Sequence, residues 1–84
     1  MDLERELRES VSRLCEVPED AIRLDSRVED LGFDSLASAE VLTDLEIKLG
    51  FEFAVDALRR LNKAQTVGDV LSILQQAVST APTR

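Results

Sequence analysis

The sequence predicts an all-α protein, a small helical bundle of three main helices and one short helix with a long first loop. Apolar residues recur at spacings of three and four in three separate stretches, which is the period of an amphipathic helix. The 84 residues leave room for a single domain, 1–84, with one core. Hydrophobic residues make up 44% of the chain, with no Trp, no Tyr and three Phe. The core is therefore expected to be aliphatic.

The first helix is expected over about residues 3–16. Asp2 precedes it and is suited to accept hydrogen bonds from the free N–H groups of the first turn. Pro18 follows it and disfavours helical backbone at the residue before it. The apolar stripe that would face the core consists of Leu3, Leu7, Val11 and Leu14.

Residues 17–33 have no sustained period and are expected to form the long loop. A loop of this length in a compact domain needs its own side chains to fix it. One short turn is expected over residues 28–31, capped by Ser26 and Glu29 and ended by Gly32. The apolar residues expected to pin the loop to the core are Val17, Ile22, Leu24, Val28 and Leu31.

The second helix is expected over residues 35–49, with Asp34 as its N-cap and Gly50 as its C-terminal stop. The acidic residues Glu40, Asp44 and Glu46 are expected to point outward. Small, mildly apolar residues lie between them. The face expected to pack on the core consists of Ser38, Val41, Leu42, Leu45 and Leu49.

A connector and a short helix are expected next. Phe51 and Phe53 are expected to attach the connector to the core, because three alternating residues are too few for a sheet. Asp56 is expected to cap a short helix over residues 57–62.

The last helix is expected over residues 67–78. Thr66 and Asp69 have the spacing of a capping box, in which each side chain accepts a hydrogen bond from the other residue's N–H. Residues 79–84 are expected to form a flexible polar tail. The buried stripe of the helix is expected to consist of Val67, Val70, Leu71, Leu74, Ala77 and Val78.

The net charge of −7 is unevenly distributed. Residues 19–56 hold eleven acids and three bases, whereas residues 57–84 hold one acid and four bases. A nucleic-acid binder would carry the opposite field. The acidic segment is expected to attract basic protein surfaces; the alternative is that it only keeps a small protein soluble.

The residue types exclude several kinds of catalytic and metal site. The chain has no His, which excludes a Ser-His-Asp triad at Ser35 and a Cys-His pair at Cys15. One Cys without His excludes the usual zinc sites, the acidic loop lacks EF-hand spacing, and no Gly-rich phosphate loop occurs. We therefore expect no catalytic residue, no metal site and no enzymatic activity.

The sequence also carries an expectation about location. No N-terminal run resembles a signal peptide, and no apolar stretch approaches the length of a membrane span. The single Cys forms no internal disulfide and suits a reducing compartment. A cytoplasmic protein without a membrane partner is expected.

Ser35 begins the second helix, at the positive end of its dipole, which is a favourable place for a phosphate. Because the chain offers no base to activate this serine, another enzyme would have to modify it. The hypothesis is that Ser35 is a covalent attachment point. The alternative is an ordinary helix start with a solvent-facing serine.

The segment Leu31-Gly32-Phe33-Asp34-Ser35-Leu36 resembles the LG-x-DSL signature of acyl carrier proteins. Two further motifs extend the resemblance over nearly the whole chain. Glu40 with Leu45-Glu46 resembles the ExxxxLE pattern of the family's second helix. The segment Thr66-Val67-Gly68-Asp69 resembles the TVGD motif that opens the family's last helix.

The resemblance implies a carrier function. Ser35 would bear a covalent 4′-phosphopantetheine arm taken from coenzyme A, and the transferase would contact Asp34. The terminal thiol of the arm, and not Cys15, would hold biosynthetic intermediates as thioesters.

The resemblance also implies a set of partners. These are a phosphopantetheinyl transferase, a ketosynthase, an acyl transferase and tailoring enzymes, all docking through basic patches on a monomeric carrier. The positions that match the family's recognition helix are Leu36, Ala39, Glu40, Thr43, Asp44 and Glu46.

Departures from the fatty-acid carriers point to a subfamily. Ala37 replaces a common acid, residues 53–56 lack the usual proline and hold only one acid, Asp56, and Arg59 and Arg60 make the short helix basic. These features resemble discrete carriers of bacterial type II polyketide pathways, which serve antibiotic biosynthesis. A fatty-acid carrier and an aminoacyl or peptidyl carrier remain alternatives within the family. From a different class, an acidic helical adaptor without a prosthetic group remains open.

Overall fold

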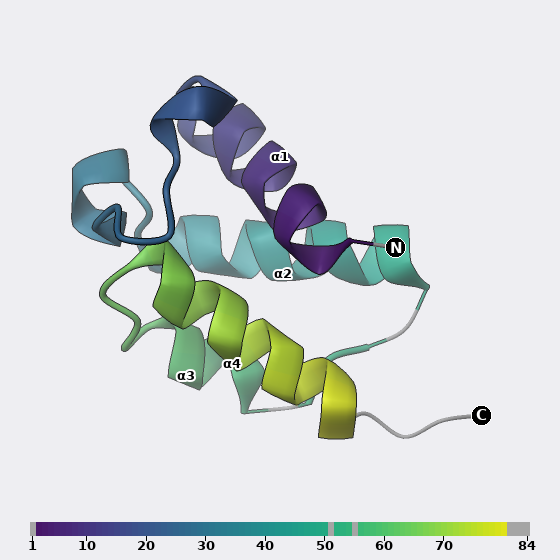
Figure 1. Cartoon of the computed structure of the whole chain (residues 1–84). Coiled ribbons are helices and arrows are strands. Elements are labelled where there is room, and N and C mark those ends of the chain that lie inside the picture. Colours follow the sequence, from purple (N-terminus) through teal and green to yellow (C-terminus); the bar gives the residue numbers. More distant parts are fainter. Residues whose placement is uncertain (1, 51, 55, 81–84) are drawn as a thin grey trace.

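The structure is a computed structural model that describes residues 2–50, 52–54 and 56–80, with side chains as far as Ala77. It confirms the all-α bundle (Figure 1). Four α-helices and two 3-10 turns occur in the described residues, with no strand and one isolated bridge. The elements are α1 (Leu3–Cys15), η1 (Glu19–Ala21), η2 (Val28–Leu31), α2 (Ser35–Leu49), α3 (Ala57–Leu61) and α4 (Val67–Thr80).

The expected caps form at three of the four helices. The Asp2 carboxylate accepts from Arg5 N at 3.4 Å in α1, and Asp34 Oδ1 accepts from Ala37 N at 2.9 Å in α2. At α4, Asp69 N donates to Thr66 Oγ1 at 3.1 Å and Thr66 N donates to Asp69 Oδ2 at 3.2 Å. Asp56 precedes α3 without such a bond, so the prediction of a side-chain cap there was wrong.

The helix ends differ from expectation by one or two residues, except in α2. Helix α1 stops one residue early because Glu16 adopts a left-handed conformation with φ 58°. Helix α3 ends at Leu61, with Asn62 as its C-cap. Helix α4 continues to Thr80, so residues 79 and 80 belong to the helix and not to a tail. The rest of the expected tail lies outside the described residues.

The long loop contains more local structure than the sequence indicated. The expected turn is present as η2 and ends at Gly32, which has φ 75°. The prediction that Ser26 and Glu29 cap this turn was wrong. Ser26 Oγ accepts from Arg23 N at 2.9 Å, and the Glu29 carboxylate pairs with Arg27 at 3.2 Å. Ser26 therefore closes the turn before η2 and does not begin η2.

Four of the five expected pins of the loop contact the core. Ile22 is buried, and Val17, Val28 and Leu31 pack half-buried against the core. Leu24 is 45% exposed, so that side chain was wrongly included. Its backbone does the fixing, because Leu24 O accepts from Gly68 N at 2.7 Å.

The loop is tied to the beginning of α4 by backbone hydrogen bonds. Besides the bond to Leu24, Val67 N donates to Ser26 O at 2.9 Å and Val28 N donates to Gln65 O at 3.0 Å. A Cβ on Gly68 would lie 3.0 Å from Leu24 O, which is why a glycine suits this position. These bonds fix the segment that leads into Asp34 and Ser35.

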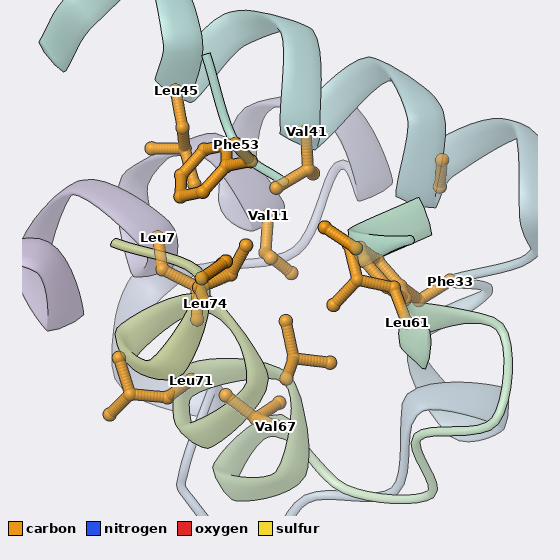
Figure 2. Packing of buried hydrophobic residues seen from close by; sticks show 14 of the residues in the cluster. Leu7, Val11, Phe33, Val41, Leu45, Phe53, Leu61, Val67, Leu71 and Leu74 are labelled. Carbon is orange, nitrogen blue, oxygen red and sulfur yellow. The ribbon is translucent and has the colours of Figure 1, made fainter. Parts of the chain in front are cut away.

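The core is mostly aliphatic, as expected, and it includes the two buried phenylalanines Phe33 and Phe53. Helices α1 and α2 pack antiparallel, and α3 contacts both α2 and α4 (Figure 1). The expected inner faces of α2 and α4 are confirmed, whereas Phe51 and the Val78 side chain lie outside the described residues. Figure 2 shows the converging side chains Leu7, Val11, Phe33, Val41, Leu45, Phe53, Leu61, Val67, Leu71 and Leu74.

Candidate functional site

Ser35 is the first residue of α2 and lies on the surface. It stands in a run of three exposed residues, Asp34 to Leu36, between the buried side chains of Phe33 and Ala37. Within the described residues the Ser35 hydroxyl has no hydrogen-bond partner. The two buried neighbours hold the backbone, and the hydroxyl between them is left accessible.

Asp34 fixes the first turn of α2. One of its oxygens accepts from Ala37 N, and its own N–H donates to Gly32 O at 3.1 Å. The sharp entry into the helix is possible because Gly32 has a left-handed backbone. The hydroxyl of Ser35 therefore leaves the helix beside free backbone N–H groups, an environment that stabilises a phosphate.

The described surroundings of Ser35 contain neither a histidine nor a metal-binding cluster. The chain has no His. No cluster of three or more His, Cys, Asp or Glu able to hold a metal ion occurs in the described residues. The site thus presents an exposed hydroxyl with neither a histidine nor such a cluster beside it in the described residues.

Cys15, at the end of α1, is the other nucleophile that the sequence offers. Its side chain is half-buried and packs against the core. Burial, and then the negative charge of Asp34, raise the pKa of the thiol above its ordinary value. A thiol that stays protonated is a poor nucleophile, which matches the expectation that Cys15 does not carry the cargo.

The expected partner-binding positions fall into two groups. Leu36, Glu40 and Thr43 are exposed in one row along α2, and Ala39 lies half-buried beside them. Ile47, 75% exposed, continues that row, and the sequence interpretation missed it. The spacings of four, three and four from Leu36 contain the signal, because residues so spaced share a helix face.

Asp44 was expected to point outward but turns towards α1. Its carboxylate accepts from the hydroxyl of the fully buried Ser10 and lies 2.8 Å from Arg13 Nη2 and 3.6 Å from Lys48 Nζ. Burial alone would raise the pKa of Asp44; hydrogen bonds from Ser10 and Arg13 and the charges of Lys48 and Arg13 hold it below its ordinary value. Its charge is largely compensated within the chain.

Glu46 is likewise engaged inside the molecule. Its Oε2 accepts from Phe53 N at 2.9 Å, which ties the connector after α2 back to that helix. The outward acid of α2 is therefore Glu40. We call the row of Leu36, Glu40, Thr43 and Ile47 the α2 face.

The packing of the core limits where an attached acyl chain could lie. Between α1, η2 and α4 lies an apolar gap too small to hold a water molecule. Space for an acyl chain there would require these elements to separate. The residues around the gap are Leu7, Val11, Val28, Leu31, Phe33, Val67 and Val70.

In the described part of the chain, no helix combines the length and the apolar character that crossing a membrane requires.

Comparison with known proteins gives one family. A family model described as a phosphopantetheine attachment site matches residues 5–74. An acyl carrier protein of Chlamydia trachomatis serovar L2 is 40% identical over 67 residues, which cover 79% of this chain and 82% of that protein. Acyl carrier protein 2 of Pseudomonas aeruginosa is 36% identical over 80 residues, which cover 94% and 98%. An acyl carrier protein of Campylobacter hominis is 42% identical over 53 residues, which cover 62% and 67%.

Proposed function

The chain belongs to the phosphopantetheine attachment-site family, as an acyl carrier protein with covalently attached 4′-phosphopantetheine, and we propose that Ser35 is the residue that bears this arm. The observation that carries the proposal is the exposed Ser35 hydroxyl, without an internal partner, at the positive end of α2. The surroundings fit the group: a phosphodiester at this position would meet the field of the helix N-terminus.

The chain's own residues present the hydroxyl and keep the helix start rigid. Asp34 holds the first turn through Ala37 N and stands where a transferase would contact it. The bound arm supplies a terminal thiol, on which intermediates are held as thioesters. The half-buried, protonated Cys15 is unsuited to that task. Acyl carrier proteins are carriers and not catalysts, which supports a carrier role for this chain.

We propose that the α2 face is the docking surface for these enzymes. Glu40 is exposed, lies five residues after Ser35 on α2, and has no ion-pair partner in the described residues. Its free charge would attract basic patches on the transferase and on condensing, acyl-transferring and tailoring enzymes. Contacts of this kind favour fast and salt-sensitive association, which suits a carrier that visits several enzymes in turn.

Our more specific proposal is that this carrier serves a polyketide pathway. The relatives are named only as acyl carrier proteins, so they do not separate polyketide from fatty-acid service. The support is the basic α3 with Arg59 and Arg60 and the absence of an acid at Ala37, features that resemble type II polyketide carriers. A ketosynthase pair encoded beside this gene would support the proposal, and a fatty-acid synthesis cluster there would contradict it.

Intact-mass measurement after co-expression with a promiscuous phosphopantetheinyl transferase tests the attachment site. The wild-type chain should gain the mass of one phosphopantetheinyl group, and Ser35→Ala should not. Ser72→Ala removes another exposed serine and is the matched control, which should load normally. Failure of the wild-type chain to gain mass would favour an acidic adaptor without a prosthetic group, and a gain that persists in Ser35→Ala would place the arm elsewhere.

A further inference from the structure

The cations of the described residues divide into two groups. Five of the nine form ion pairs within the chain: Arg5, Arg8, Arg13, Arg27 and Lys48. Of the four that have no carboxylate within ion-pair distance, three lie together at α3. These are Arg59, Arg60 and Lys63, and we call them the basic patch.

The basic patch is unusual for this chain. Acids outnumber bases by seventeen to ten in the chain. Two acids of the described residues lie near the patch in sequence: Asp56, just before α3, and Asp69, at the first turn of α4, which borders the same groove as Arg60 and Lys63. Asp69 Oδ2 accepts from Gln65 N at 3.0 Å and from Thr66 N at 3.2 Å. These backbone bonds lower the pKa of Asp69, which stays charged but faces the helix start. Three cations against these two acids leave a net positive charge at the patch.

The structure also gives the patch a shape. Between α3 and α4 lies an open groove of 350 Å³, bordered by Arg60 and Lys63 and lined in part by the apolar Ala64 and Ile73. The guanidinium of Arg60 donates to the side-chain oxygen of Gln76 on α4, which links the two helices at the edge of the groove. Arg59 and Lys63 are exposed.

We propose that this groove is a second docking surface, which takes an acidic, apolar-containing segment of a partner protein. Carboxylates would pair with Arg59 and Lys63, and an apolar side chain would lie on Ala64 and Ile73. Charge complementarity selects this partner: the exposed cations of the groove attract carboxylates, whereas the free charge of the α2 face, Glu40, requires a basic surface. The inference goes beyond the proposed function, because it depends neither on Ser35 nor on the cargo.

Other occupants fit less well. Nucleic acid and anionic lipid are large negative surfaces, and a chain with a net charge of −7 would be repelled by them outside the patch. A second copy of this chain could offer Glu40 of its α2 face, but that face lies beside Ser35 and would then be closed to enzymes. A local acidic protein segment avoids both conflicts.

The test is an NMR titration of the full ¹⁵N-labelled chain with the blocked octapeptide EELEELEE at low salt. Shifts are expected at residues 57–64 and 69–76. In Arg59→Glu with Lys63→Glu, affinity should fall about tenfold, as expected when two exposed ion pairs are replaced by repulsion. The matched control, Arg5→Glu with Arg23→Glu, changes the net charge equally at other exposed cations and should retain most of the affinity.

Several outcomes would overturn the proposal. These are equal losses in the two double variants, shifts confined to other parts of the chain, or no binding at low salt. Vesicles of phosphatidylglycerol or a short DNA duplex that bind through Arg59 and Lys63 more tightly than the peptide would assign the patch to a different partner. So would a dimer in sedimentation that Arg59→Glu with Lys63→Glu dissolves. Should that variant unfold by circular dichroism, Arg59→Gln with Lys63→Gln replaces it, against Arg5→Gln with Arg23→Gln.

Discussion

Two regions of the molecule use the same charged residue types in opposite ways. Along the seam between α1 and α2, every charge meets a partner: Lys48 Nζ lies 3.7 Å from Glu6 Oε1, and Asp44 joins Ser10, Arg13 and Lys48. We call these five residues the α1–α2 seam. At the basic patch, three cations cluster with no carboxylate of the described residues within ion-pair distance. The seam uses charge to orient two helices, and the patch leaves charge available to other molecules.

The same contrast separates two acids of α2. Glu40 and Asp44 lie one helical turn apart, and the sequence pattern predicts an outward position for both. Asp44 is compensated from α1, whereas Glu40 stays exposed. A substitution at Asp44 should therefore act on stability and one at Glu40 on docking.

Breaking the seam should have the largest effect. Asp44→Ala leaves the buried Ser10 hydroxyl without its acceptor and removes the partner of two cations. We expect a loss of about 2 kcal/mol in the free energy of unfolding, measured with urea. Glu40→Ala is the control on the same helix and should not shift the urea midpoint measurably. Equal effects of the two substitutions would show that the seam contributes nothing specific.

Acid should weaken the seam in a defined pH range. The folded-state pKa of Asp44 lies below its ordinary value of 3.8, so its stabilisation is fully present above that value. It is lost as the pH falls through the lower, folded-state pKa. The urea midpoint of the wild-type chain should therefore fall more steeply below about pH 4 than that of Asp44→Asn. Parallel curves for the two proteins would contradict this assignment.

Removing the exposed acid of the α2 face should slow loading and spare the fold. Glu40→Lys is expected to reduce the rate of phosphopantetheine transfer at low salt by roughly three- to tenfold, with the difference shrinking at high salt. Glu19→Lys, at an exposed acid of η1, has the same charge change and should load nearly normally. The same reduction in both variants would mean that net charge, and not the α2 face, controls docking.

The smallest effect on stability is expected at the basic patch. Arg59→Gln with Lys63→Gln removes two exposed charges that pair with nothing in the described residues, so the urea midpoint should stay within measurement error. Because acids elsewhere dominate the chain, any shift that does appear should be small. A clear loss of stability would show that these cations have an internal role and would weaken the contrast with the seam.

The sequence by itself determined the helices and most of their caps, because these depend on residues that are close together in the chain. The periodic apolar residues gave the four helices, Asp2, Asp34 and the Thr66–Asp69 box gave three N-termini, and Gly50 gave the end of α2. The signature around Ser35 belongs to this class, because six consecutive residues carry it. Local signals of this kind survive folding, since the hydrogen bonds involved span only three or four positions.

The tertiary structure decided the rest, because the deciding partners are far away in the sequence. Ser10 and Asp44 are 34 positions apart, and Leu24 meets Gly68 only where the loop crosses the start of α4. Which acids of α2 stay free, which loop residue binds through its backbone, and which cations lack a partner all follow from such contacts. Charge along the chain can be counted from the sequence, but its compensation depends on the distances that only the fold sets.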